Sequence, residues 1–183
     1  MKNDTFSQES ILDAFEYAFR NLYELDHKLF AVDVQERAIA GRLAMHLRQY
    51  YLQYETRNTD DKSYFIDIEY NRDRSHVKNP CNYYKSWTAP DIIFHNRGRS
   101  GENDNIFCCE IKKNSQSGKY DSVKIKKLLD AFGYLYGFDI YKLSYNVICF
   151  DLYEKLLVKQ GNRKYSKKMY QFTLKHGIEP LQW

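Results

Sequence analysis

The segment NIFCCEIKK, residues 105–113, limits the possible folds most, because it begins as a buried strand and ends with charges. Its first residues are apolar or compatible with a strand, whereas Glu110 and Lys112 stand two positions apart. Side chains two apart in a strand point to the same face, so both charges would share the face of Ile106 and Cys108. A solvated strand end with a cross-strand ion pair is one interpretation, and a functional site is the other.

A partner for this strand is predicted immediately upstream. The stretch DIIFH, which begins at Asp91, has the pattern of a short strand, and the polar, glycine-containing turn NRGRSGEND connects the two. In an antiparallel hairpin the start of one strand lies beside the end of the other, so Asp91 and Glu110 would face each other. Taken alone, Asp91 could also be a turn acid that follows Pro90.

Two facing carboxylates repel each other unless a cation lies between them or one of them is protonated. The carboxylates of Asp91 and Glu110, a backbone carbonyl such as that of Ile111, and water are ligands that Mg²⁺ accepts. Lys112 beside such a cation requires an anion or a nucleophile nearby, such as a phosphate or a metal-activated water. Two acids, a lysine and Mg²⁺ together predict phosphodiester hydrolysis.

Periodicity predicts helices and strands on both sides of the hairpin. The predicted helices cover residues 8–25, 33–55 and 123–137, and the other predicted strands cover 64–70 and 144–152. Residues 71–88 have no period and are predicted to form a long loop. Residues 153–177 are ambiguous between a helix and a hairpin that turns at Gly161 and Asn162. Three strands, a crossover helix and another strand predict an α/β fold with a mixed central sheet flanked by helices.

Composition narrows the class of protein. A length of 183 residues predicts a single domain, residues 1–183. The polar N-terminal segment and the lack of a long apolar run predict a soluble, cytoplasmic protein without a membrane partner. Four cysteines without a C-x-x-C pair are expected to be buried thiols in a reducing compartment.

The formal net charge of +4 is small, but its distribution is uneven. Lysines crowd after the hairpin and again toward the C-terminus. They form either an ordinary solvated surface or a surface that binds nucleic acid.

Pro90–Asp91, followed after a hairpin by Glu110–Ile111–Lys112, resembles the signature of the PD-(D/E)XK nuclease superfamily, whose fold is restriction-endonuclease-like. The predicted order of elements over about 33–151 resembles the αβββαβ core of that superfamily. The segments ERAIAGRLAMHL, EYNRD, PDIIFHNRG and CCEIKK resemble its prokaryotic members. The resemblance implies that Asp91 and Glu110 bind Mg²⁺ or Mn²⁺ and that Lys112 is the catalytic lysine. Cutting of both DNA strands would imply a homodimer.

The resemblance extends to residues outside the hairpin. It implies an acid on an upstream helix, and Glu36 is the matching position, for which the alternative is a helix-capping role together with Asp33. Lys126 or Lys127 resembles the position at which many members direct a polar residue toward the phosphate. A solvated lysine face is the alternative for these two residues.

The predicted 71–88 loop could hold DNA through Arg72 and Arg74 and stack bases on Tyr83 and Trp87. Equally, these two rings could pin the loop to the core. Lys113 is a further candidate for contact with DNA.

Together these patterns predict a metal-dependent nuclease that hydrolyses DNA, in defence, repair or mobile-element biology. The alternative is a catalytically inactive nucleic-acid-binding or assembly module on the same fold, although such a module has no reason to keep two facing acids. A structural partner protein, whose basic tail binds an acidic neighbour, would leave the acids unexplained.

Overall fold

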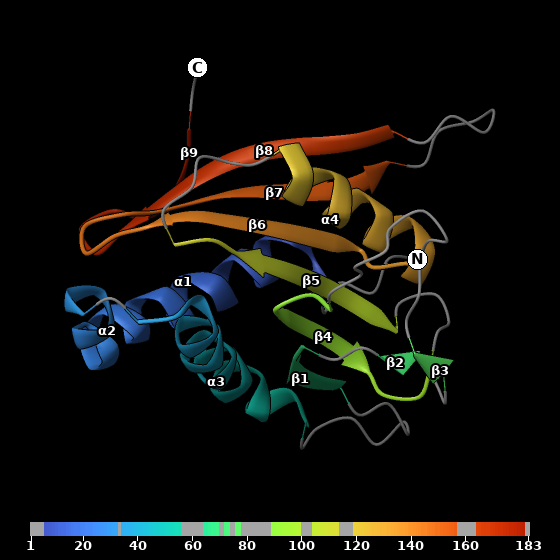
Figure 1. The fold of residues 1–183 in the computed structure, drawn as a ribbon, viewed down its shortest axis with the longest axis horizontal. Coiled ribbons are helices and arrows are strands. Elements are labelled where there is room, and N and C mark those ends of the chain that lie inside the picture. The colour runs from blue at the N-terminus through green and yellow to red at the C-terminus, as the bar shows by residue number, and fades with distance from the viewer. Residues whose placement is uncertain are drawn as a thin grey trace.

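The computed structural model describes residues 6–32, 34–55, 64–69, 72–73, 76–77, 89–99, 104–113, 119–156 and 164–181. The described helices are α1 (Gln8–Asp26), α2 (Lys28–Ala31), α3 (Glu36–Glu55) and α4 (Lys119–Phe132). The described strands are β1 (Tyr64–Ile68), β2 (Arg72–Asp73), β3 (His76–Val77), β4 (Ile92–Asn96), β5 (Asn105–Ile111), β6 (Tyr136–Leu143), β7 (Ile148–Leu156), β8 (Lys164–Thr173) and β9 (Gly177–Pro180). Seven of the strands form one mixed sheet in the order β1-β4-β5-β6-β7-β8-β9, with helices packed against it (Figure 1). The predicted α/β class with a mixed central sheet is confirmed.

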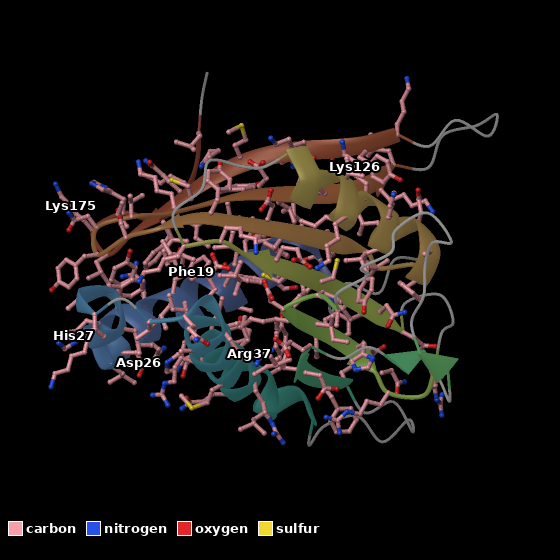
Figure 2. The ribbon with its side chains drawn as sticks, in the orientation of Figure 1. Phe19, Asp26, His27, Arg37, Lys126 and Lys175 are labelled. Carbon is pink, nitrogen blue, oxygen red and sulfur yellow. The ribbon has the colours of Figure 1, made fainter. Side chains whose placement is uncertain are left out.

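α1 forms where it was predicted, because its apolar residues recur at helical spacing and a serine caps its first turn. The Ser7 hydroxyl accepts a hydrogen bond from the Ser10 N–H at 3.2 Å. Phe15 and Phe19, the latter labelled in Figure 2, are fully buried. The ring of Phe15 stacks on that of Phe138 in β6, with 4.0 Å between centroids. α1 therefore covers the middle of one face of the sheet.

The helix predicted over 33–55 begins at Glu36, and the short helix α2 precedes it. Its apolar stripe is fully buried in the same hydrophobic cluster as α1, as at Ile39 and Leu43. His46 is also fully buried, and its Nε2 lies 2.7 Å from Oδ2 of Asp26 at the end of α1. α1 and α3 thus form one layer, joined by a polar contact as well as by packing. None of the helices in the described ranges is long and apolar enough to cross a membrane.

The sheet is mixed because the chain crosses it through α4. β1, β4 and β5 pair antiparallel, β5 and β6 pair parallel, and β6 to β9 pair antiparallel. A parallel pair needs a crossover connection, which α4 supplies (Figure 1). α4 packs Ile125, Leu128 and Leu129 with Ile93 and Cys108 in a second hydrophobic cluster, separate from that of α1 and α3. The sheet therefore has a core on each face.

The prediction for residues 123–152 is wrong because it misses a strand. The helix predicted to end near Gly137 ends at Phe132, and Gly137 lies inside β6. The strand predicted at 144–152 begins at Ile148 and continues to Leu156 as β7. Seven of the eight residues of β6 are buried, so it lacks the alternation of polar and apolar residues that marks a half-exposed strand.

The ambiguous segment 153–177 is a hairpin rather than a helix. The end of β7 pairs antiparallel with β8, from Leu156 opposite Lys164 to Ile148 opposite Phe172. β9 then pairs antiparallel with β8 and forms the end of the sheet order. The predicted turn residues 161 and 162 lie outside the described residues.

The predicted 71–88 loop contains the short antiparallel pair of β2 and β3. Arg72 belongs to β2, but its side chain is outside the described part of the structure. The residues predicted to stack on bases, Tyr83 and Trp87, also lie outside the described residues, as does Arg74. Their role stays a prediction.

Three of the four cysteines, Cys108, Cys109 and Cys149, are buried free thiols, as predicted, and Cys81 lies outside the described residues. Burial raises the pKa of the Cys109 thiol well above its ordinary value. This thiol is therefore a neutral part of the core.

Gly137 allows α4 to lie close to β6. A Cβ atom at this position would lie 2.3 Å from Cγ2 of Ile125, closer than two carbon atoms that are not bonded to each other can approach. We expect Gly137→Ala to lower the free energy of unfolding by about 1–3 kcal/mol, measured by urea denaturation. Ile125→Ala removes the clashing methyl group, so it should recover part of this loss in the double variant.

Gly41→Ala is the matched control, because the nearest atom to its added Cβ, Cδ1 of Ile68, is 3.9 Å away. Since Gly41 lies inside α3, alanine should leave the stability unchanged or raise it. A Gly137→Ala variant as stable as the wild type would contradict the close packing of α4 on β6.

Candidate functional site

The pairing of β4 with β5 brings Asp91 to the end of β5. Ile92 is paired with Cys109, so the next pair in this antiparallel register is Asp91, just before β4, and Glu110 in β5. Oδ2 of Asp91 accepts a hydrogen bond from the backbone N–H of Ile111 at 2.7 Å. The carboxylate of Asp91 therefore lies beside the last residues of β5, where the hairpin ladder ends.

Burial raises the pKa of the Asp91 carboxyl group above its ordinary value. The hydrogen bond from Ile111 and the charges of Lys124 and Lys112 act in the opposite direction, because they favour the ionised form. The negative charge of Glu36 adds to the rise, since like charges disfavour ionisation. Asp91 is therefore within electrostatic reach of a second acid and of two lysines from different parts of the chain.

Glu110 is buried, with 3% of its surface exposed, and it is paired with a lysine. Its Oε1 lies 2.5 Å from Nζ of Lys124 on α4. The same ammonium group donates a hydrogen bond to the carbonyl of Ala89 at 3.2 Å. Because a buried carboxylate needs a compensating partner, Lys124 stabilises the charge of Glu110, and it joins α4 to β5 and to the segment before β4.

Glu36, the first residue of α3, lies against the chain that follows β5. Its Oε2 is 3.3 Å from Nζ of Lys112, and its Oε1 accepts a hydrogen bond from the backbone N–H of Lys113 at 2.9 Å. The side chains of Lys112 and Glu36 are 38% and 41% exposed, so this pair lies at the protein surface. The alternative capping role involves Asp33, which is outside the described residues.

The structure thus brings together the four residues predicted to be catalytic, Asp91, Glu110, Lys112 and Glu36. They come from the start of β4, the end of β5 and the start of α3. The buried ion pair of Lys124 with Glu110 and the exposed ion pair of Lys112 with Glu36 both lie at this end of the hairpin.

The residues predicted to contact DNA are less closely grouped. Nζ of Lys113 donates a hydrogen bond at 3.4 Å to a backbone carbonyl of the segment before α3. The ammonium of Lys126, labelled in Figure 2, lies over two tyrosine rings of β7 and β8, 5.6 and 5.8 Å from their centroids. Lys127 is half-buried on the same helix, and the side chain of Arg72 is outside the described part.

The sequence reasoning missed Lys124 as a partner of the site, and it missed two acids beside Glu110 in the sheet. Glu110 is in register with Asp139 of β6, and Asp139 is in register with Asp151 of β7. Both aspartates are fully buried. Oδ2 of Asp151 lies 2.7 Å from Nζ of Lys167 on β8. A row of acids therefore continues from the hairpin across two further strands.

Signals for these residues were present in the sequence. Lys124 stands four positions before Leu128, so it lies on the apolar stripe of its helix and is directed to the sheet. Asp139 and Asp151 interrupt apolar runs, and an acid in a buried strand needs a partner. The sequence does not identify that partner.

The carboxylates of Asp91 and Glu110 have the donor chemistry that Mg²⁺ and Mn²⁺ prefer. In the part of the chain that the structure describes, no group of three or more His, Cys, Asp or Glu side chains is arranged to hold a metal ion. A cation at the hairpin end would therefore need further ligands from backbone oxygens, such as the predicted carbonyl of Ile111, and from water. Because Mg²⁺ keeps several waters in proteins, these residues fit a hard cation with few protein ligands.

Asp91→Asn tests the environment of this carboxylate. Because burial raises the pKa of Asp91 in the folded protein, its ionisation costs stability as the pH rises above the ordinary carboxyl range. The variant keeps an oxygen atom for the Ile111 N–H and removes the charge. We expect it to melt at a higher temperature than the wild type at about pH 7 in a chelating buffer, with a smaller difference near pH 4. A lower melting temperature at neutral pH would show that the attraction of Lys124 and Lys112 to the Asp91 charge outweighs the cost of its burial.

No protein-family model matches the chain, and no curated protein or solved structure matches it either. Its function is therefore inferred from the residues gathered at the end of the hairpin.

Proposed function

We propose that the protein is a Mg²⁺-dependent nuclease that hydrolyses phosphodiester bonds of DNA. The observation that carries the proposal is the meeting of Asp91, Glu110, Glu36 and Lys112 at one end of the hairpin. Packing does not explain a half-buried carboxylate with a raised pKa, Asp91, in register beside the buried carboxylate of Glu110, because both are unfavourable there. An acid with a perturbed pKa among charged groups from separate segments is typical of functional sites.

The order of elements supports a restriction-endonuclease-like fold for this nuclease. Apart from the two-residue strands β2 and β3, the chain runs through α3, β1, β4, β5, α4 and β6 in an αβββαβ series. The last two strands of that series are parallel, as a crossover through α4 requires. In this proposal β7, β8 and β9 extend the sheet beyond the nuclease core.

A divalent cation bound by Asp91, Glu110 and the Ile111 carbonyl would supply a water molecule of lowered pKa and would neutralise charge on the phosphate. Lys112 is exposed enough to donate to the phosphate or to the attacking water. Glu36 holds the ammonium of Lys112 at 3.3 Å, so it acts as a positioning residue.

The lysines near the site support DNA, rather than a small molecule, as the substrate. Lys113 follows Lys112 directly, and Lys126 and Lys127 are half-buried on the neighbouring helix α4. Lysine contacts with phosphates hold a nucleic acid in place without reading its sequence. Arg72 remains a candidate for the same role.

Cleavage of linear, circular and single-stranded DNA, and of RNA, in Mg²⁺ or Mn²⁺ tests the proposal. We expect the wild type to cut DNA and expect Asp91→Ala and Lys112→Ala to lower the rate at least about 100-fold, because each removes stabilisation of charge at the reacting phosphate. Glu9→Gln and Lys175→Ala are matched controls, since both side chains are exposed. Glu9 lies in the first turn of α1, and Lys175, labelled in Figure 2, lies between β8 and β9. Rates in the Asp91 and Lys112 variants equal to the wild-type rate would refute the site assignment.

A nucleic-acid-binding module without catalysis is the second candidate. The observation that favours it is that Glu110 is paired with Lys124 and Glu36 with Lys112, so these charges are compensated within the chain. Such a module would bind DNA with a strong dependence on salt concentration and leave it intact. Salt-sensitive binding without cleavage in the same assay would select this candidate.

A further inference from the structure

We propose that Lys124 sets the affinity of the candidate site for divalent cations, because its ammonium group holds a carboxylate that the cation needs. The inference rests on the proposed function, since it concerns the same acids, Asp91 and Glu110. Nζ of Lys124 lies 2.5 Å from Oε1 of Glu110 and 3.2 Å from the carbonyl oxygen of Ala89.

The contact between Lys124 and Glu110 is made largely out of water. Their side chains are 18% and 4% exposed, whereas the pair of Lys112 and Glu36 lies at the surface. An ion pair with little access to water is screened less than an exposed pair, so it is harder to separate. Of these two pairs, the buried one is the stronger competitor for a metal.

Lys124 also contacts the segment that carries Asp91. Ala89, which accepts a hydrogen bond from Lys124, is two residues before Asp91, so one ammonium group bridges the segment before β4 and the end of β5. Lys124 thus takes the place of the cation that two facing carboxylates require.

The packing of α4 keeps the backbone of Lys124 at this point. The next residue, Ile125, is fully buried and lies so close to β6 that only a glycine, Gly137, is accommodated opposite it. Leu128, one turn further along, is also fully buried. The helix cannot move away without opening this core, so only the flexible side chain of Lys124 can withdraw from Glu110.

A divalent cation and an ammonium group repel each other strongly when both lie beside one carboxylate. Binding of Mg²⁺ or Mn²⁺ to Glu110 must therefore break the contact with Lys124. It follows that removing the charge of Lys124 should tighten metal binding, even though Lys124 is not itself a ligand.

Titration calorimetry of Mn²⁺ into the metal-free protein, without DNA, tests the proposal. Lys124→Gln removes the charge but keeps hydrogen-bond donors for Glu110 and Ala89. We expect this variant to bind Mn²⁺ at least about fivefold more tightly than the wild type. We also expect a larger rise in its melting temperature on addition of Mn²⁺. Equal or weaker binding by Lys124→Gln overturns the proposal.

Two further variants separate the effect of the charge at position 124 from the effect of the net charge of the protein. Lys124→Arg keeps the charge and should bind Mn²⁺ no more tightly than the wild type. Lys175→Gln removes the same charge from the exposed turn between β8 and β9, so its affinity for Mn²⁺ should equal that of the wild type. If Lys175→Gln gained as much affinity as Lys124→Gln, net charge alone would explain the effect and the proposal would be wrong.

Failure of the proposed function gives a different result. Asp91→Asn and Glu110→Gln should abolish Mn²⁺ binding if these acids hold the metal. Mn²⁺ binding that is unchanged in both variants refutes the site together with the inference. Binding that needs both acids but does not respond to Lys124 refutes the inference alone. If Lys124→Gln is unfolded without metal, we expect Mn²⁺ to refold it, and circular dichroism measures this refolding. An absence of refolding counts against the proposal.

Discussion

The antiparallel pairing of β4 with β5 is the contact on which the rest of the structure depends. Because Ile92 pairs with Cys109, Asp91 reaches the end of β5 and accepts the N–H of Ile111. The same two strands lie between β1 on one side and β6 on the other, so they connect the antiparallel and parallel parts of the sheet. Their apolar side chains belong to both hydrophobic clusters. The hairpin therefore supports the core and places the candidate site at its end.

The buried acids of the sheet are difficult to explain by a gain in folding stability. Glu110, Asp139 and Asp151 occupy neighbouring positions in three buried strands, and lysines of α4 and β8 lie against two of them. Well-packed apolar residues in such places are usually as stable as a buried ion pair, or more stable. In our proposal the acid of β5 is kept for metal binding, and the lysine that compensates it controls how easily the metal enters.

Much of the fold was predictable from local pattern, and one central strand was not. α1, α3 and the β4–β5 hairpin have amphipathic spacing or clear turn residues, and they lie close to where they were predicted. β6 is almost entirely buried, so its sequence resembles the end of a buried helix, and Gly137 inside this strand has the pattern of a helix terminus. The partner of Glu110 was also missed, because several lysines of α4 have similar surroundings in the sequence.

The sequence by itself determined that Asp91 and Glu110 would lie close together, because antiparallel pairing in a hairpin relates the start of one strand to the end of the other. Only the tertiary structure decided which cation compensates them. The rotation of α4 about its axis is set by the packing of Ile125 against Gly137, and this rotation directs Lys124, rather than the lysines beside it, to the hairpin. Contacts within a hairpin follow from local pattern, whereas contacts between a helix and a distant strand follow from how side chains fill the core between them.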